Sequence, residues 1–325
     1  MAIQRSPARS GRGGGFLTSA LRFAGYDFDC RSTTPTSQAN STKPGAGGVS
    51  AGGRYMHTLP PDVESARSLL EEYSGIPPEH VDTHVYQMRD RLWDVYPFAC
   101  VGRFRFLSFE FTADAYYQVA LFRLLQAQTE PEPAEHETRL LDVGCCVGQV
   151  LRKLAFDGVD SSRLYGTDVE PRFLDIGYEL FRDRNTFQAD FVIGDLVKQG
   201  EGDERLDVLD GKMTFIHATS FFHLFTWDDQ VRAAIRMVRF LQPGRRDAMI
   251  FGRQVGTVLP RDNGKAGSDK VYLHNAHSWQ RLWDEVGERT GTKWKTTMEP
   301  TETIETGAGG VESSLRKMTF SVVRG

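Results

Sequence analysis

The segment 140–148, with the sequence LLDVGCCVG, most limits what this chain can fold into. An apolar run ends there in an acid and a glycine turn, and a helical pattern follows at once. In open α/β proteins this order of strand, turn and helix begins a nucleotide-type cofactor site. Asp168 ends a second apolar run, 20 residues past Gly148, where a carboxylate can accept hydrogen bonds from both hydroxyls of an adenosine ribose. The pair predicts a cofactor-dependent enzyme.

Strand and helix patterns alternate along the chain after residue 138, which is typical of an α/β fold with a parallel sheet. The apolar runs expected to form strands are residues 139–143, 163–168, 190–194, 212–218, 248–255, 292–298 and 315–323. The helical patterns lie at residues 148–156, 171–181, 227–241 and 278–289. The last two strands are expected to pair antiparallel, across a glycine-rich loop at 307–310.

A polar segment at 128–137, with Pro131 and Pro133, separates this part from a different kind of sequence. Residues 61–127 show helical periodicity and many aromatic side chains, which favours a cap above a hydrophobic substrate. For each ring, packing of the cap against the sheet is the alternative. The predicted units are a disordered extension at 1–54, a helical, aromatic-rich cap at 55–135 and a cofactor-binding domain at 136–325.

The N-terminal extension is rich in Gly, Ser, Thr and Arg and holds two acids, Asp27 and Asp29. Such a composition cannot bury enough apolar surface to fold, so we expect disorder. With Arg5, Arg9 and Arg12 and no acid before Asp27, residues 1–30 resemble a mitochondrial transit peptide, and a solvated tail is the alternative that we favour.

The overall composition excludes several classes of function. A formal net charge of −4 and the lack of a basic stripe argue against nucleic-acid binding. No apolar stretch of the sequence is long enough to cross a bilayer. The four cysteines form no C-x-x-C pair and have no histidine at a metal-site spacing, so we expect no metal. Free thiols are typical of a reducing compartment, and we expect a cytoplasmic protein.

The glycine turn argues against a dinucleotide cofactor. A dinucleotide fingerprint reads G-x-G-x-x-G, which brings the N-terminus of a helix to a pyrophosphate. Here Gly144 and Gly148 are present, but Cys146 stands in place of the middle glycine and Gln149 follows the turn. A cofactor without phosphates fits better, which points to S-adenosylmethionine.

With Asp168 and the segment Gly194-Asp195-Leu196, the turn resembles that of the class I S-adenosylmethionine-dependent methyltransferases. The resemblance covers residues 138–325. It implies a Rossmann-like α/β fold with a seven-stranded, mostly parallel sheet and an antiparallel last strand. The helical segment at 55–135 would then be an N-terminal cap.

The same resemblance implies a role for each residue of the motifs. Asp142 and Gly144 would lie by the methionine end of S-adenosylmethionine, and Asp168 would hold the ribose. Asp195 and Leu196 would frame the adenine. The remaining residues of the implied cofactor site are Cys145, Gly148 and Val169.

A narrower resemblance covers residues 62–325. The segments that carry it are SGIP at 74–77, YPF at 96–98, GRFRFL at 102–107, DVGCC at 142–146, GYELFRD at 177–183 and GRQVG at 252–256. They are similar to segments of fungal methyltransferases from gene clusters for meroterpenoids and related secondary metabolites, which share the double cysteine. This resemblance implies methylation of the carboxyl group of a prenylated aromatic polyketide. The alternatives are a phenol or hydroxyl acceptor, and a cofactor-binding protein that assists a cyclisation without methyl transfer.

The acceptor decides whether a general base is needed. A carboxylate, with a pKa near ~4, is already ionised, whereas a phenol or alcohol profits from a base. His223, beyond the expected strand 212–218, is the candidate base or orienting residue, and a packed core histidine is the alternative. Arg253 can hold a substrate carboxylate with its forked guanidinium, or form a surface ion pair instead.

Four aromatic residues of the cap are expected to line the pocket for a prenyl chain: Trp93, Tyr96, Phe98 and Phe104. The predicted substrate is therefore a small hydrophobic metabolite. The sequence is also compatible with a homodimer.

Overall fold

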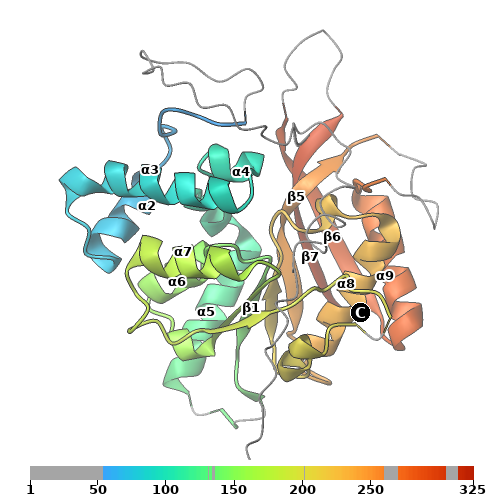
Figure 1. Ribbon diagram of the computed structural model, residues 1–325. Helices are drawn as coiled ribbons and strands as arrows, with labels where there is room; N and C mark the ends of the chain where they lie inside the picture. Colours follow the sequence, from blue (N-terminus) through green and yellow to red (C-terminus); the bar gives the residue numbers. More distant parts are fainter. Residues whose placement is uncertain (1–53, 131, 134–135, 201, 260–269, 305–313) are drawn as a thin grey trace, which may run out of the picture.

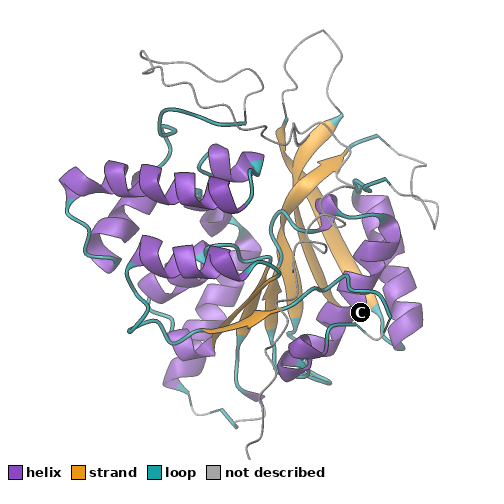
Figure 2. Cartoon of the chain, viewed as in Figure 1, coloured by secondary structure: helices purple, strands orange, loops and turns teal. Residues whose placement is uncertain are grey.

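A seven-stranded sheet runs through the molecule, and the computed structural model places its strands in the order β3-β2-β1-β4-β5-β7-β6 (Figure 2). Strand β7 is antiparallel to both of its neighbours, and the other pairings are parallel. The strands are β1 Leu140–Val143, β2 Leu164–Asp168, β3 Asp190–Ile193, β4 Phe215–His217, β5 Met249–Thr257, β6 Trp294–Thr303 and β7 Leu315–Arg324. The predicted fold class, a mostly parallel sheet with an antiparallel last strand, is confirmed.

The structure describes residues 54–130, 132–133, 136–200, 202–259, 270–304 and 314–325. The expectations for the N-terminal extension before Arg54 and for the glycine-rich loop at 307–310 lie outside the described residues. Among the described residues, no helix is both long and apolar enough to span a membrane.

Helices cover both faces of the sheet, which explains why its central strands are apolar on both sides. Leu140 of β1 packs into the core on one face, while its neighbour Leu141 packs into the core on the other. Figure 1 shows α5, α6 and α7 on the first face and α8 and α9 on the second. These helices are α5 Ala115–Thr129, α6 Gln149–Phe156, α7 Pro171–Phe181, α8 Trp227–Phe240 and α9 Ala276–Thr290.

Local capping chemistry sets the ends of these helices. Pro171 occupies the first turn of α7, where its missing N–H removes no hydrogen bond. The Thr226 side chain caps α8, and Asn275 and Ser278 form a capping box at the start of α9. Because that box begins at Asn275, α9 starts two residues before the predicted position 278.

The expected strand at 212–218 is shorter in the structure, where β4 spans only Phe215–His217. Met213 makes an isolated bridge to Leu241 and does not continue the ladder. The closing pair is longer than predicted, since β6 extends to Thr303 and β7 to Arg324. Their antiparallel pairing is confirmed.

The cap before the sheet is helical, as expected, but it is broken into short pieces. Its elements are α2 Glu64–Ser68, the π-helical turn η1 Leu69–Tyr73, α3 Pro78–Val95, α4 Ala99–Gly102 and the 3₁₀ turns η2 Arg105–Leu107 and η3 Glu110–Ala113. Further 3₁₀ turns within the sheet region are η5 Ser161–Arg163, η6 Glu204–Leu209 and η7 Phe222–Leu224. Helix α3 lies along α7 (Figure 1), where a ring nitrogen of His84 lies 2.9 Å from the Leu180 carbonyl oxygen and Arg91 forms an ion pair with Glu179. The cap is therefore attached through α7 to the helices that flank the glycine turn.

Candidate functional site

The glycine turn follows β1 at the edge of the sheet where the parallel strands end. The backbone N–H groups of Gly144 and Cys145 both donate to the Thr167 carbonyl oxygen on β2, at 2.8 and 3.1 Å. Gly144, Cys146 and Gly148 all have positive φ, at 67°, 50° and 67°. The turn therefore uses left-handed backbone at three positions, and Cys146 adopts it despite its side chain.

Close contacts around the turn explain why glycine occupies both position 144 and position 148. A Cβ at Gly148 would lie 2.4 Å from Nη1 of Arg152 and 3.2 Å from the Phe191 ring. A Cβ at Gly144 would lie 3.1 Å from the ring of Phe221, which follows β4. The turn is closely packed at both ends, so its shape depends on the absence of these side chains.

Asp168 lies at the end of β2, directly beside the turn. Its Oδ2 accepts a hydrogen bond from the Cys146 N–H at 2.9 Å, and its Oδ1 accepts one from the Glu170 N–H at 3.0 Å. Burial raises the pKa of this carboxyl group above its ordinary value, against the effect of the backbone donors. A carboxylate has about four acceptor positions, so its backbone donors, Cys146, Glu170 and Val169, leave capacity for a ribose hydroxyl. Val169 next to it is 44% exposed.

Asp195 and Leu196 follow β3 in a tight turn. The Asp195 Oδ1 accepts from the Val197 N–H at 2.9 Å, and Leu196 is buried. The Asp195 N–H donates to Oδ2 of Asp203 at 3.0 Å. Arg205 donates to the Asp203 carboxylate and holds its pKa well below the ordinary value. The prediction missed Asp203, because nothing in the sequence indicates that an acid eight residues away returns to this turn.

Asp142 meets a partner that the sequence did not reveal. Its Oδ1 lies 2.7 Å from Nδ1 of His217, and Nε2 of His217 lies 2.8 Å from Oγ1 of Thr219. The Thr219 hydroxyl also accepts from the Arg253 N–H at 3.1 Å. Asp142 and His217 are 3% and 1% exposed. This chain of contacts joins the ends of β1 and β4 to the middle of β5, so Asp142 is tied to the strands beneath the turn.

His223, the candidate base, lies on η7 just past β4. Among the described residues its Nδ1 is buried without a hydrogen-bond partner. Burial lowers the pKa of its imidazole to about 4. The ring is therefore neutral at pH 7 and is a weak base.

Three of the four candidate aromatics in the cap are partly exposed, and two of them, Tyr96 and Phe98, lie together near α7. Tyr96 and Phe98 have ring centroids 4.2 Å apart, and Phe98 lies 6.3 Å from Phe173 of α7. Trp93 makes an edge-to-face contact with Tyr55 at 5.0 Å.

Phe104 is separate from this group. Its ring is 1% exposed, packs edge-to-face on Tyr86 at 5.5 Å and lies under the Arg89 guanidinium at 4.7 Å. Phe104 is therefore a packing residue in the core of the cap, which is the alternative to lining the substrate pocket.

Arg253 projects from β5 toward the start of α5. Its Nε donates to the Asp114 carboxylate at 2.6 Å, its Nη2 donates to the second oxygen of the same group, and Glu110 lies 3.4 Å from Nη1. The side chains of Arg253 and Asp114 are 19% and 10% exposed. The pair is thus a largely enclosed clamp between the sheet and the helical segment before it, and the guanidinium fork is already occupied.

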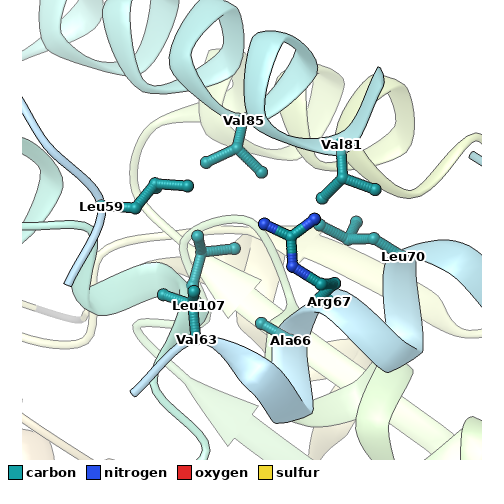
Figure 3. Close-up of a pocket in the computed structure, with 8 residues that line it drawn as sticks. All are labelled: Leu59, Val63, Ala66, Arg67, Leu70, Val81, Val85 and Leu107. Atoms are coloured by element: carbon teal, nitrogen blue, oxygen red, sulfur yellow. The ribbon is translucent and has the colours of Figure 1, made fainter. Parts of the chain in front are cut away.

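A small cavity in the cap is shown in Figure 3. It lies between α2, α3 and η2, and has a volume of about 10 Å³, room for about one water molecule. Its lining is mostly apolar, and it consists of Leu59, Val63, Ala66, Arg67, Leu70, Val81, Val85 and Leu107. It is a packing defect of the cap, remote in sequence from the turn and its acids.

The residues at the strand ends fit S-adenosylmethionine. The turn provides a tight backbone bend without the helix-directed glycine pattern of a diphosphate site. Asp168 keeps free acceptor capacity beside the turn, and the loop at Asp195 and Leu196 follows the next strand in the sheet. The structure thus brings together the acids and glycines that the sequence predicted as a cofactor site.

Comparison with known proteins is consistent with this geometry. The family model described as the meroterpenoid methyltransferase N-terminal domain matches residues 55–107, and a methyltransferase domain model matches residues 140–244. The chain is 41% identical to the O-methyltransferase phiE of Fungal sp., over 76% of this chain and 79% of the relative.

Two further relatives have similar coverage. The chain is 36% identical to the asnovolin E/chermesin D methyltransferase nvfJ of Aspergillus novofumigatus, over 71% of this chain and 78% of the relative. It is 35% identical to the O-methyltransferase atr3 of Stereocaulon alpinum, over 83% and 75%. From the fold, the turn with its acids and these relatives, the chain belongs to the S-adenosylmethionine-dependent methyltransferases of fungal secondary metabolism.

Proposed function

We propose that this methyltransferase methylates the carboxyl group of a hydrophobic, prenylated aromatic polyketide of the meroterpenoid type. S-adenosylmethionine supplies the methyl group, and a carboxylate oxygen of the acceptor forms the new bond as the bond to sulfur breaks. Asp168 would hold the ribose of this donor. The loop at Asp195 and Leu196 would hold its adenine.

The lack of a suitable base at the exit of β4 carries the carboxyl assignment. His217 is buried between Asp142 and Thr219, so it is enclosed by protein partners. His223 has a pKa of about 4, which is far below that of a phenol. Neither imidazole is suited to deprotonate a phenol, whereas a carboxylate is ionised at pH 7 and needs no base.

In this scheme His223 orients the acceptor as a neutral hydrogen-bond donor. Trp93, Tyr96 and Phe98 form the apolar side of the acceptor site. Their position in the segment matched by the meroterpenoid N-terminal model supports an acceptor of that class. These aromatic side chains would exclude water from the reacting carboxylate oxygen, and loss of its hydration raises the reactivity of that oxygen.

A role for Arg253 in holding the acceptor requires an exchange of partners. The acceptor carboxylate would replace Asp114 on the guanidinium fork, because both oxygens of Asp114 occupy it in the structure. The released Asp114 stays near Glu110, so the exchange has an electrostatic cost that the acceptor must offset.

The test uses two acceptors with one prenylated aromatic scaffold. One carries a free carboxyl group and a methylated phenol, and the other a free phenol and an esterified carboxyl group. With S-adenosylmethionine labelled in the methyl group, we expect label only in the first product, and alkaline hydrolysis should release it as methanol. Label in the phenol alone would refute the carboxyl assignment.

The His223→Asn variant provides the second arm. Because an orienting residue contributes less than a general base, we expect kcat to fall less than tenfold. A general base contributes about 100-fold or more. A loss of that size, with a phenol as the better acceptor, would assign His223 as the base.

A further inference from the structure

Arg152 is a buried arginine directly behind the cofactor turn. It lies on α6, four residues after Gly148, and is 1% exposed. Its Nε and Nη2 donate to the two carboxylate oxygens of Asp183, at 2.9 and 3.0 Å. Its Nη1 donates to the Val147 carbonyl oxygen at 3.0 Å. One guanidinium thus ties the backbone of the turn to the carboxylate that follows α7.

The surroundings of Arg152 are aromatic, and its side chain is buried. Four rings lie 4.4–5.5 Å from the centre of the guanidinium, and they belong to Tyr178, Phe181, Phe187 and Phe191. Burying an ion pair has a desolvation cost, and apolar side chains of the same volume often give a fold of equal or greater stability. An apolar replacement would remove the donor to Val147, however. The particular contribution of the guanidinium is therefore the geometry of the turn.

Helix α7 also packs against the Val147 carbonyl group. A Cβ at Gly177 would lie 2.5 Å from the Val147 carbonyl oxygen, so the helix backbone packs directly on the turn. Asp183 follows Arg182, which ends α7 in the left-handed conformation with φ 53°. The end of α7 is thereby turned so that the Asp183 carboxylate faces Arg152.

The cap reaches this ion pair through Tyr73, the last residue of η1. The Tyr73 hydroxyl donates to Oδ2 of Asp183 at 2.8 Å. Burial and the charge of Asp183 raise the pKa of this hydroxyl, so it remains a donor at all ordinary pH values. A continuous series of contacts therefore runs from the cap through Asp183 and Arg152 to Val147 in the turn.

We propose that Tyr73, Asp183 and Arg152 are positioning residues for the cofactor turn, and that they make its affinity for S-adenosylmethionine depend on the docked cap. In this arrangement the cap contributes to cofactor binding as well as to the acceptor site. Its docking orients Asp183, which aligns the guanidinium that holds the Val147 carbonyl. Binding of the cofactor can be measured without an acceptor, so its result does not depend on which acceptor group is methylated.

The test measures binding of S-adenosylhomocysteine to the full chain by calorimetry. Tyr73→Phe removes one hydroxyl and leaves a buried carboxylate with one donor fewer, so we expect binding about five- to tenfold weaker. The matched control is Tyr86→Phe, because the Tyr86 hydroxyl accepts from the Leu59 N–H at 3.0 Å within the same cap. We expect this control to lose similar stability and to keep the wild-type affinity.

Two further readouts separate positioning from general destabilisation. Amide exchange at Cys146–Gly148 should become faster in Tyr73→Phe and stay unchanged in Tyr86→Phe. Arg152→Lys keeps the charge but loses the fork, so we expect binding at least tenfold weaker, with a smaller added effect of Tyr73→Phe in the double variant. Equal affinity for the wild type, Tyr73→Phe and Tyr86→Phe would overturn the proposal, as would strictly additive effects in the double variant.

Discussion

Oδ2 of Asp168 accepts the Cys146 N–H at 2.9 Å, so the acid that would hold the ribose also holds the glycine turn. Cys146 presents this N–H because its backbone is left-handed, with φ 50°. The contact explains how a turn without its middle glycine keeps a defined shape. It also couples the two parts of the cofactor site, since a change at either residue moves the other.

Replacing Asp168 with alanine should abolish cofactor binding. The variant loses the acceptor for the ribose and the acceptor for the Cys146 N–H, each a hydrogen bond to a charged group of about 1.5–3 kcal/mol. We expect S-adenosylhomocysteine binding at least 100-fold weaker by calorimetry, with an unchanged circular dichroism spectrum. An affinity within threefold of the wild type would remove Asp168 from the site.

Cofactor affinity should also decline in acid. Burial raises the pKa of Asp168 above its ordinary value, so the carboxyl group takes up a proton at a higher pH than an exposed aspartate does. The protonated group loses acceptor capacity, so the affinity should fall as the pH is lowered from 7.5 toward 4.5. Calorimetry at four pH values across this range measures the decline, and a constant affinity would contradict the prediction.

Gly148→Ala should disrupt the turn by collision as well as by strain. Its Cβ would meet Nη1 of Arg152 at 2.4 Å, whereas a Cβ at Gly291 would have no atom within 4 Å. Both glycines have nearly the same φ, 67° and 68°, so Gly291→Ala is a control for strain alone. We expect both variants to lose about 1 kcal/mol of stability from strain. Only Gly148→Ala should also weaken binding of S-adenosylhomocysteine, by tenfold or more.

The free energy of unfolding should fall as the pH drops below about 6.5. Burial lowers the pKa of His223 to about 4 and that of His274 to about 3. The unfolded chain has ordinary histidines near ~6.5 and binds more protons in this range, so acid favours unfolding. For His274, which is 1% exposed, the loss is on the order of 3 kcal/mol.

Chemical denaturation between pH 7.5 and 4.5 measures this dependence. His274→Gln should reduce the slope of stability against pH, even if it lowers stability at pH 7.5 by disturbing the contacts with Gln230 and Ser278. The matched control is His80→Gln, which replaces an exposed histidine. Parallel slopes for the wild type and His274→Gln would count against the prediction.

The Arg253 clamp predicts opposite effects for its two partners. If the acceptor carboxylate replaces Asp114, then Asp114→Asn should release the guanidinium and lower KM for a carboxyl acceptor several-fold. Arg253→Gln should raise KM, because the fork is lost. Steady-state kinetics with a carboxyl acceptor measure KM for both variants. A similar rise of KM in both would indicate a clamp that only attaches α5 to the sheet.

Much of the cofactor site could be predicted because its signals are local. The run at 140–148 and the acids Asp168 and Asp195 each follow a strand directly, and parallel strands bring their carboxyl ends to one edge. The prolines, glycines and capping residues that end the helices are likewise local signals, since they act within a few residues. The predicted boundaries were wrong mainly where tertiary contacts extend or shorten a strand, as at β4 and β6.

The partners of the site residues could not be predicted in this way. Asp142 and His217 are 75 residues apart, and Arg253 and Asp114 are 139 residues apart. Each side chain has many possible partners of suitable charge in the sequence. For Arg253 the sequence predicts a substrate ligand or a surface ion pair, and the structure shows a largely enclosed ion pair with Asp114.

The alternation of strands and helices, the glycine turn and the acids beside it can be read from the sequence, because they depend on backbone preferences and on side chains close along the chain. Long-range packing sets the rest: Phe104 lies in the core of the cap, His217 contacts Asp142, and Arg152 donates to the Val147 carbonyl oxygen in the turn. Those outcomes depend on which distant surfaces pack together and exclude water, and burial then sets the charge state and orientation of each group.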